Sequence, residues 1–163
     1  MSFNIPFIKQ VSIPALMFQF LLITGIYFVL KPLIIEFAFL ITALTYAVIA
    51  RVLRSIIAKA HRKGISLVKK HQYKEAIPNF EKSVKYFTDH ESIDQYRFIT
   101  LLSASKMSYR EMGLCNIAFC YSQIGEGQKS KTYYELVLRD YPKNGIAISG
   151  LRMLNSIHNV AAE

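Results

Sequence analysis

The residue types that usually carry out chemistry do not form a recognisable catalytic or metal-binding pattern in this sequence. The chain has no glycine-rich phosphate loop, no Cys-x-x-Cys, no His-Glu-x-x-His and no Gly-x-Ser-x-Gly. The histidines are scattered without the spacing of a metal site: His61, His71, His90 and His158. We therefore expect no catalysis, no metal and no cofactor.

Two cysteines and one acid are the remaining chemical candidates. Cys115 and Cys120 are five residues apart, about 140° around a helix, so they cannot pair with each other. We expect them to be buried helix residues in a reducing compartment. Glu36 lies in an apolar stretch, which raises the hypothesis of a membrane enzyme or transport subunit. The alternative is structural, because Glu36 could reach the interface or pair with Lys31.

The elements that would position these residues belong to two unlike parts of the chain. Of 163 residues, 52% are hydrophobic and only 19% are charged. The first 50 residues hold just three of the charges, Lys9, Lys31 and Glu36, and the rest follow Ala50. Such an uneven distribution argues against a single soluble globule. We predict a membrane anchor over residues 1–50 and a polar domain over 51–163.

Two apolar runs in the first part predict a transmembrane hairpin. Residues 11–30 contain no charge, and residues 33–50 contain one. Each run has about the length of one crossing. Pro32 suits the first turn of the second helix. A hairpin that dips in from one side is the alternative, because the turn at Lys31-Pro32 is very short.

Small residues in the hairpin predict close helix packing. Ala43 and Ala47 form a small-xxx-small pattern that Ala50 extends, and Gly25 falls opposite Ala38 in a hairpin folded at residues 31–32. The same pattern could serve a homodimer, and the sequence leaves both possibilities open.

A basic cluster follows the second run directly. Residues 51–74 contain eight basic and no acidic residues, which account for most of the net charge of +9. Its position favours anionic headgroups over nucleic acid. Together with the single Lys in the turn, it predicts a multi-pass protein of the plasma (inner) membrane with both termini cytoplasmic. The predicted lipid-headgroup contacts are Arg51, Arg54, Lys59, Arg62, Lys63, Lys69, Lys70 and Lys74.

The polar part has helical periodicity with two related segments. In the first, Gly64 is followed by Tyr73-Lys-Glu-Ala-Ile-Pro-Asn-Phe80. The second begins near a capping box, Ser108-Tyr-Arg-Glu111, and ends at Pro142. Between them the small and aromatic positions recur at Leu114, Ile117, Ala118, Tyr121, Tyr134 and Val137.

These residues resemble the tetratricopeptide repeat (TPR) family, which has a 34-residue helix–turn–helix pattern. Residues 57–90 and 111–144 would be the two repeats, and Ser130 stands where the family usually has Ala. Residues 91–110 would be an insertion and residues 145–158 a C-terminal helix. The resulting fold class is all-α, a two-helix transmembrane hairpin followed by a short TPR-like α-solenoid with a C-terminal capping helix.

The resemblance also implies a protein-binding groove along the first helix of each repeat. The family's groove positions correspond to His61, Ile65, Val68, Lys69, Met112, Cys115, Asn116, Phe119 and Gln123. Phe119 and Asn116 are the expected centre, since that helix is apolar on two sides and must bury both. The occupant would be a peptide or an amphipathic helix of an unknown protein partner, unless the chain's own C-terminal helix fills the groove.

The first hypothesis is thus a non-enzymatic, membrane-anchored TPR adaptor. The second is an anionic-lipid or nucleic-acid surface binder that uses residues 51–74. The third is an accessory subunit of a membrane complex, an enzyme or transporter, that uses Glu36.

Overall fold

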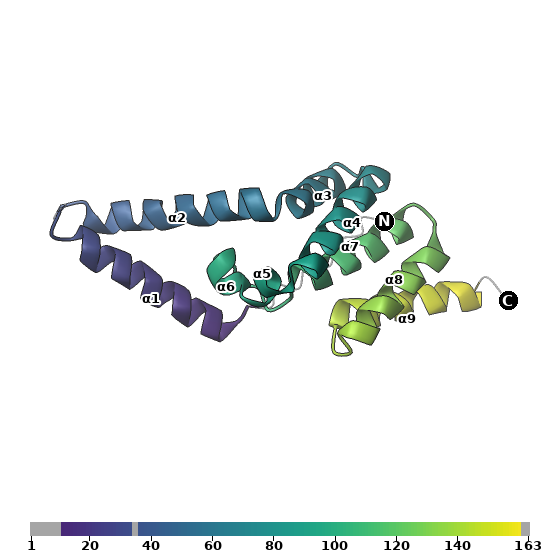
Figure 1. The fold of residues 1–163 in the computed structure, drawn as a ribbon. Coiled ribbons are helices and arrows are strands. Elements are labelled where there is room, and N and C mark those ends of the chain that lie inside the picture. Colours follow the sequence, from purple (N-terminus) through teal and green to yellow (C-terminus); the bar gives the residue numbers. More distant parts are fainter. Residues whose placement is uncertain (1–10, 34–35, 161–163) are drawn as a thin grey trace. The chain divides into compact units, whose positions relative to one another are not determined.

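The computed structural model describes residues 11–33 and 36–160, and within them the fold is all-α, as expected (Figure 1). No strand forms in these ranges; a single backbone bridge joins Val11 to Ser105. The helices are α1 (Ile13–Leu30), α2 (Ala38–Ile57), α3 (Lys59–Lys69), α4 (Tyr73–Asp89), α5 (Glu91–Gln95), α6 (Arg97–Thr100), α7 (Tyr109–Gln123), α8 (Gly127–Asp140) and α9 (Gly145–Val160).

The chain divides into two compact units. The hairpin unit contains α1 and α2 together with residues 91–108, which form α5 and α6. The stacked-helix unit contains residues 60–90 and the chain from Tyr109 onward, with most of α3 and all of α4, α7, α8 and α9. This division differs from the expected one at residue 50, because α2 continues unbroken past Ala50 to Ile57. Residues 91–108 also belong with the apolar helices, although they are far from them in sequence.

Both helices of the hairpin are long and apolar enough to cross a membrane. The first matches the run predicted over residues 11–30, with Pro14 in its first turn. The second starts at Ala38, five residues later than predicted, and the described residues between the helices are turns. Pro32 therefore does not open α2. It has no N–H to continue the hydrogen-bond ladder of α1, which ends at Leu30.

The later start of α2 changes which small residues are buried. Ala38 and Thr42 are buried in the first turns of α2, and the Thr42 hydroxyl donates to the Ala38 carbonyl at 2.7 Å. Ala43 and Ala47 are exposed on another side of the helix. The prediction for Gly25 is also wrong, since a Cβ added there would have no heavy atom within 4 Å. Gly25 instead lines an open apolar hollow of about 530 Å³ between α1 and α2.

From α4 onward, the stacked-helix unit is built by packing each helix on the next. Helix α4 packs against α7, α7 against α8, and α8 against α9. Small residues let these helices approach closely. A Cβ added at Gly64, Gly113 or Gly150 would lie within 2.7 Å of a side chain on the neighbouring helix, those of Phe80, Val84 and Tyr134 respectively.

At the α7–α8 contact the small residue is Ser130. It is fully buried, and its hydroxyl donates to the carbonyl of Ala118 at 2.8 Å. A serine fits this position because its one polar group has a backbone acceptor within reach.

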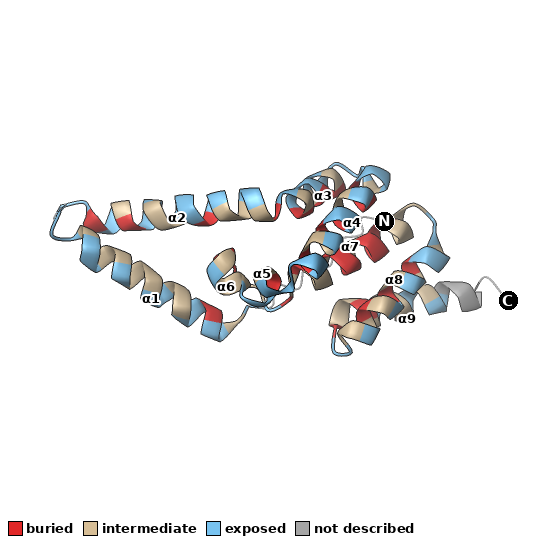
Figure 2. Ribbon diagram, viewed as in Figure 1, coloured by how far each residue is buried: buried red, intermediate tan, exposed pale blue. Residues whose placement is uncertain are grey.

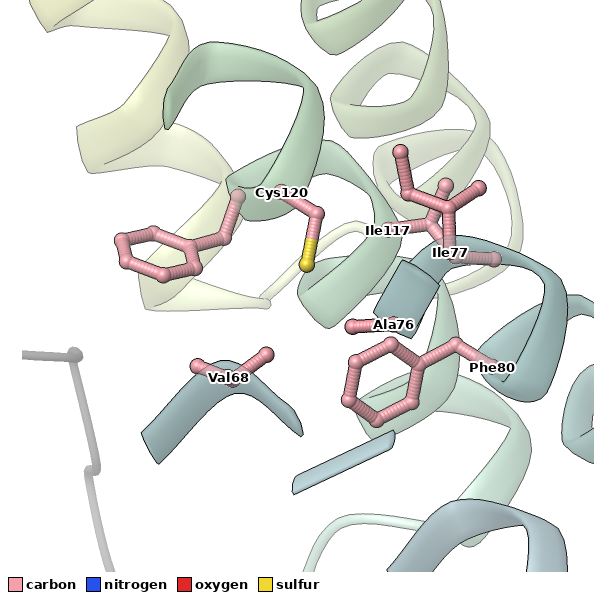
Figure 3. Packing of buried hydrophobic residues seen from close by; sticks show 7 residues of the cluster. Val68, Ala76, Ile77, Phe80, Ile117 and Cys120 are labelled. Atoms are coloured by element: carbon pink, nitrogen blue, oxygen red, sulfur yellow. The ribbon is translucent and has the colours of Figure 1, made fainter. Parts of the chain in front are cut away.

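The core of the stacked-helix unit draws on α3, α4 and α7. Figure 2 shows buried residues concentrated on α7, whereas α1 and α2 are mostly half-buried or exposed. Phe80 and Ala76 belong to this cluster, lie side by side and are both fully buried (Figure 3). The buried members of this core cluster are Val68, Ala76, Ile77, Phe80, Ile117, Phe119 and Cys120.

Candidate interaction surfaces

The structure distributes the nine predicted groove residues between core and surface. Four are buried: His61, Val68, Cys115 and Phe119. Four are half-buried, and Lys69 is exposed; the half-buried side chains are Ile65, Met112, Asn116 and Gln123. The buried four pack the stacked-helix unit and present no surface to a partner.

Phe119 is a core residue rather than the centre of an exposed groove. Its side chain is 7% exposed and belongs to the core cluster. The ring meets Tyr73, the first residue of α4, edge-on at 5.9 Å between centroids. The second apolar side of α7 is therefore covered by residues of α3 and α4, which removes the need for a partner at this position.

His61 is held neutral inside the same unit. Burial lowers the pKa of its imidazole to about 4. The ring meets Phe80 and Tyr109 edge-on at 5.5 and 5.2 Å, and its Nδ1 lies 3.5 Å from the Ser83 hydroxyl. A neutral, aromatic-packed histidine fits a structural role.

The two cysteines form no disulfide with each other, and their thiols are held in the unreactive, protonated form. Both are buried, and burial raises the pKa of each thiol to about 12. Since the thiolate is the reactive form, neither suits a nucleophile. The Cys115 thiol donates to the Asn144 side-chain oxygen at 3.8 Å.

Asn144 has a structural role that the sequence patterns above did not single out. Its side-chain oxygen accepts the Ala147 N–H at 2.8 Å, so Asn144 caps the start of α9. Its amide donates to Glu111 at 2.7 Å, which ties α9 to α7. An Asn directly before a new helix is a recognisable capping signal.

Arg110 connects three helices. Its guanidinium donates to Asp140 at 2.6 Å, to the Tyr141 hydroxyl at 3.2 Å and to the Thr88 hydroxyl at 3.1 Å. Hydrogen bonds from Arg110 and Arg139 lower the pKa of Asp140. No short sequence pattern reveals this link, because its partners lie 22 to 31 residues away.

The predicted lipid-contact residues form an exposed basic set, with one exception. On α3, Lys59, Arg62 and Lys63 project away from the side of the buried Gly64, and Lys70 lies just after the helix. The full exposed set is Arg51, Lys59, Arg62, Lys63, Lys69, Lys70 and Lys74. Within the described ranges none of the seven makes an ion pair.

Arg54 is the exception among the predicted headgroup contacts. Its guanidinium donates to the carbonyls of Leu101 (3.0 Å) and Leu102. It is half-buried and committed to the protein, so its charge does not project with the others.

Glu36 lies outside the second helix. It is exposed in the turn that precedes Ala38. The Lys31 ammonium lies 6.0 Å from the centre of the Tyr27 ring, and no described contact pairs it with Glu36. A catalytic or transport role within a span therefore has no geometric support. Among the described residues there is also no group of three His, Cys, Asp or Glu that could hold a metal.

Comparison of the whole chain with protein-family models, curated proteins and solved structures found no match. The surfaces that bear on function are those described above, chiefly the exposed apolar helices, the basic residues on and near α3 and the half-buried members of the predicted groove.

Proposed function

We propose that this protein is a membrane-anchored, non-enzymatic adaptor whose stacked-helix unit presents a binding surface for another protein. The observation that carries the proposal is the exposure of large apolar side chains on α1 and α2. Phe20 is 74% exposed and Phe39 79%, and Ala15 is the only buried residue of α1. Leaving such surface in water is unfavourable by about 25 cal/mol per Å². An apolar patch of this extent is typical of a membrane-contacting surface.

The dimensions and the turn support complete crossings. The helices have 18 and 20 residues, about 27 and 30 Å, close to the thickness of the hydrocarbon layer. The turn contains two exposed charged residues, Lys31 and Glu36. A hairpin that only dipped into the bilayer would bring both charges into hydrocarbon, whereas two full spans place them in water.

The basic set supports a cytoplasmic orientation of both termini in the plasma (inner) membrane. Residues 51–74, directly after the second apolar run, contain eight basic residues, and only Lys31 lies in the turn. The side with more Lys and Arg stays in the cytoplasm. A reporter that is active only outside the cytoplasm, fused after Glu163, should therefore give no signal, while the same reporter inserted after Pro32 should. The opposite pattern would contradict the orientation.

The adaptor part of the proposal rests on the likeness to TPR repeats. The motif residues Gly64, Ala76 and Phe80 are buried, and α4, α7, α8 and α9 pack one on the next, which supports the proposed likeness. Of the nine predicted groove residues, five are not buried and form the proposed binding surface: Ile65, Lys69, Met112, Asn116 and Gln123. Partly exposed Met and Ile beside polar groups suit an amphipathic helix.

Site-specific crosslinking tests this surface. A photoreactive residue would replace Met112 in the full chain, and cells would be irradiated with the protein in its own membrane. We expect a discrete crosslinked product from position 112 and none from the exposed Glu135 on α8. Equal products from positions 112 and 135, or no product from position 112, would refute a partner at this surface.

A second, compatible function is contact with anionic headgroups through the basic set. The favouring observation is that all seven of its side chains are exposed, without ion pairs in the part of the chain that the structure describes. Each basic residue near an anionic surface contributes on the order of 1 kcal/mol.

A further inference from the structure

Residues 91–108 pack on the apolar hairpin instead of extending the stacked helices. The Phe98 ring on α6 meets Phe18 of α1 edge-on, with 5.3 Å between centroids. The Ser12 N–H donates to the Ala104 carbonyl at 2.9 Å, and Arg54 of α2 donates to the Leu101 carbonyl at 3.0 Å. The segment is therefore attached to both apolar helices.

Several backbone carbonyls of this segment accept hydrogen bonds from side chains. The Arg97 guanidinium donates to three carbonyls, those of Asp94 (2.9 Å), Ser105 (3.0 Å) and Lys106 (2.6 Å). The Thr100 hydroxyl donates to the Ile93 carbonyl at 2.8 Å. Such internal pairing is what irregular backbone needs where water is scarce, since an unpaired carbonyl in an apolar medium costs several kcal/mol.

The contacts fix the depth of the segment relative to the apolar helices. Phe18 lies five residues after the start of α1, about 8 Å along its axis. Arg54 lies four residues after Ala50, about 6 Å beyond the end of the second apolar run. Helix α6 and the loop after it are thus held at the level where the apolar surface of the hairpin ends.

The outer side of the segment carries the aromatic Tyr96 and the apolar Ile99 among exposed polar residues, which are Glu91, Ser92, Gln95 and Lys106. Tyr96 is 51% exposed and Ile99 48%, and the two lie three residues apart. Tyr at the level of the membrane–water interface can place its ring among the upper acyl chains and its hydroxyl among headgroups.

From this placement we infer that residues 91–108 form an interfacial membrane element, with Tyr96 and Ile99 inserted among lipids at the edge of the hydrocarbon layer. The inference rests on the proposed function, because the depth argument requires α1 and α2 to enter a bilayer. The occupant of this surface is lipid; coverage by a second copy or another protein is the competing outcome.

Depth-dependent fluorescence quenching tests the inference on the full chain in vesicles. An environment-sensitive probe would be attached to Ile99→Cys and, in a separate protein, to Tyr96→Cys. Leu44→Cys, exposed midway along the apolar part of α2, marks deep hydrocarbon, and Glu135→Cys on α8 marks a position outside the hairpin unit. The unmodified chain should take up no label, since Cys115 and Cys120 are buried.

We expect blue-shifted emission at positions 96 and 99, with greater loss of fluorescence to lipids brominated near the headgroup than to lipids brominated near the chain end. Position 44 should show the reverse order, and position 135 should lose little fluorescence to either. Quenching at 44 without quenching at 96 and 99 would overturn the inference alone. Blue-shifted but unquenched probes at 96 and 99 would mean coverage by protein and would also overturn it. Absence of quenching at 44 would overturn the proposed membrane anchor and this inference with it.

Discussion

Helices α1 and α7 use apolar residues in opposite ways. Helix α1 has 18 residues and buries one, Ala15. Helix α7 has 15 residues and buries eight, including Leu114 and Ile117, among neighbouring helices. The difference teaches that apolar content alone does not decide burial. Helices α4 and α8 cover the apolar residues of α7, whereas the described chain leaves most of those on α1 uncovered. This supports the membrane anchor proposed above.

Glycines show the same contrast at the level of single atoms. Gly64 is needed because the Phe80 ring occupies the space of a side chain, and a Cβ added at Gly64 would lie 2.7 Å from that ring. Gly25 borders the open hollow of the hairpin, and a Cβ added there would meet nothing in the described chain within 4 Å. Helix contact is tight in one unit and loose in the other.

The largest expected effect comes from truncating a buried ring. Phe119→Ala should lower the free energy of unfolding of the stacked-helix unit by about 3–5 kcal/mol, because it leaves a cavity in the core cluster. Phe39→Ala is the matched control on an exposed position of α2 and should leave that unit unchanged. Urea unfolding of the micelle-bound chain, followed by hydrogen exchange in α7, measures both. Equal effects of the two changes would remove the contrast between the units.

Acid should destabilise the stacked-helix unit through His61. Its pKa is about 4 in the folded chain against an ordinary value near 6.5, so the unfolded chain binds the proton more readily. The stability that neutral His61 contributes is complete above pH 6.5 and decreases as the pH falls towards 4, by about 3 kcal/mol in total.

Urea midpoints between pH 7 and pH 4 check this dependence. The decrease should appear in the amides of α3, α4 and α7 and be largely absent in His61→Leu. Because Asp140 titrates below its ordinary value of 3.8, its contribution falls outside this window. An unchanged pH profile in His61→Leu would contradict the assignment.

Adding a methyl group separates the two kinds of helix contact. Gly64→Ala should cost about 1–3 kcal/mol, since the Phe80 ring must move to admit the new Cβ. Gly25→Ala should cost nothing, because its Cβ would point into open space. Thermal unfolding of the two variants beside the parent chain makes the comparison. A loss for Gly25→Ala as large as that for Gly64→Ala would show that the hairpin helices are tightly packed after all.

The smallest expected effect concerns the members of the basic set on and directly after α3. Lys63→Gln combined with Lys70→Gln should weaken contact with anionic vesicles by on the order of 1 kcal/mol per charge. In the parent chain, hydrogen exchange in α3 should be slower in anionic than in zwitterionic vesicles. The difference should vanish at high salt, since exposed charges are screened over about 10 Å at 0.1 M. Lys82→Gln on α4 is the control; if it acts as strongly as the α3 changes, the contact is not specific to α3.

Local sequence patterns determined the elements of this protein well. The uncharged run over residues 11–30 predicted α1 almost to the residue, and the spacing of Gly64, Ala76 and Phe80 predicted which side of the following helices is buried. These predictions succeed because run length and helical period depend only on neighbouring residues. The start of α2 was misplaced, since hydropathy alone does not distinguish an apolar turn from a helix.

Only the tertiary structure decided what covers each surface. The sequence marked Phe119 as apolar, but Tyr73 and the rest of the core cluster made it a packing residue. The sequence showed that Arg54 is basic, but only the structure showed that its guanidinium donates to the backbone carbonyl of Leu101. The sequence predicted residues 91–110 as an insertion between repeats. Their contact with α1 joins Phe98 to Phe18, some 80 residues apart in the sequence, and no local pattern indicates it. Which segment covers a helix face depends on contacts between residues that are distant in the sequence. The local spacing of apolar residues does not indicate which segment that will be.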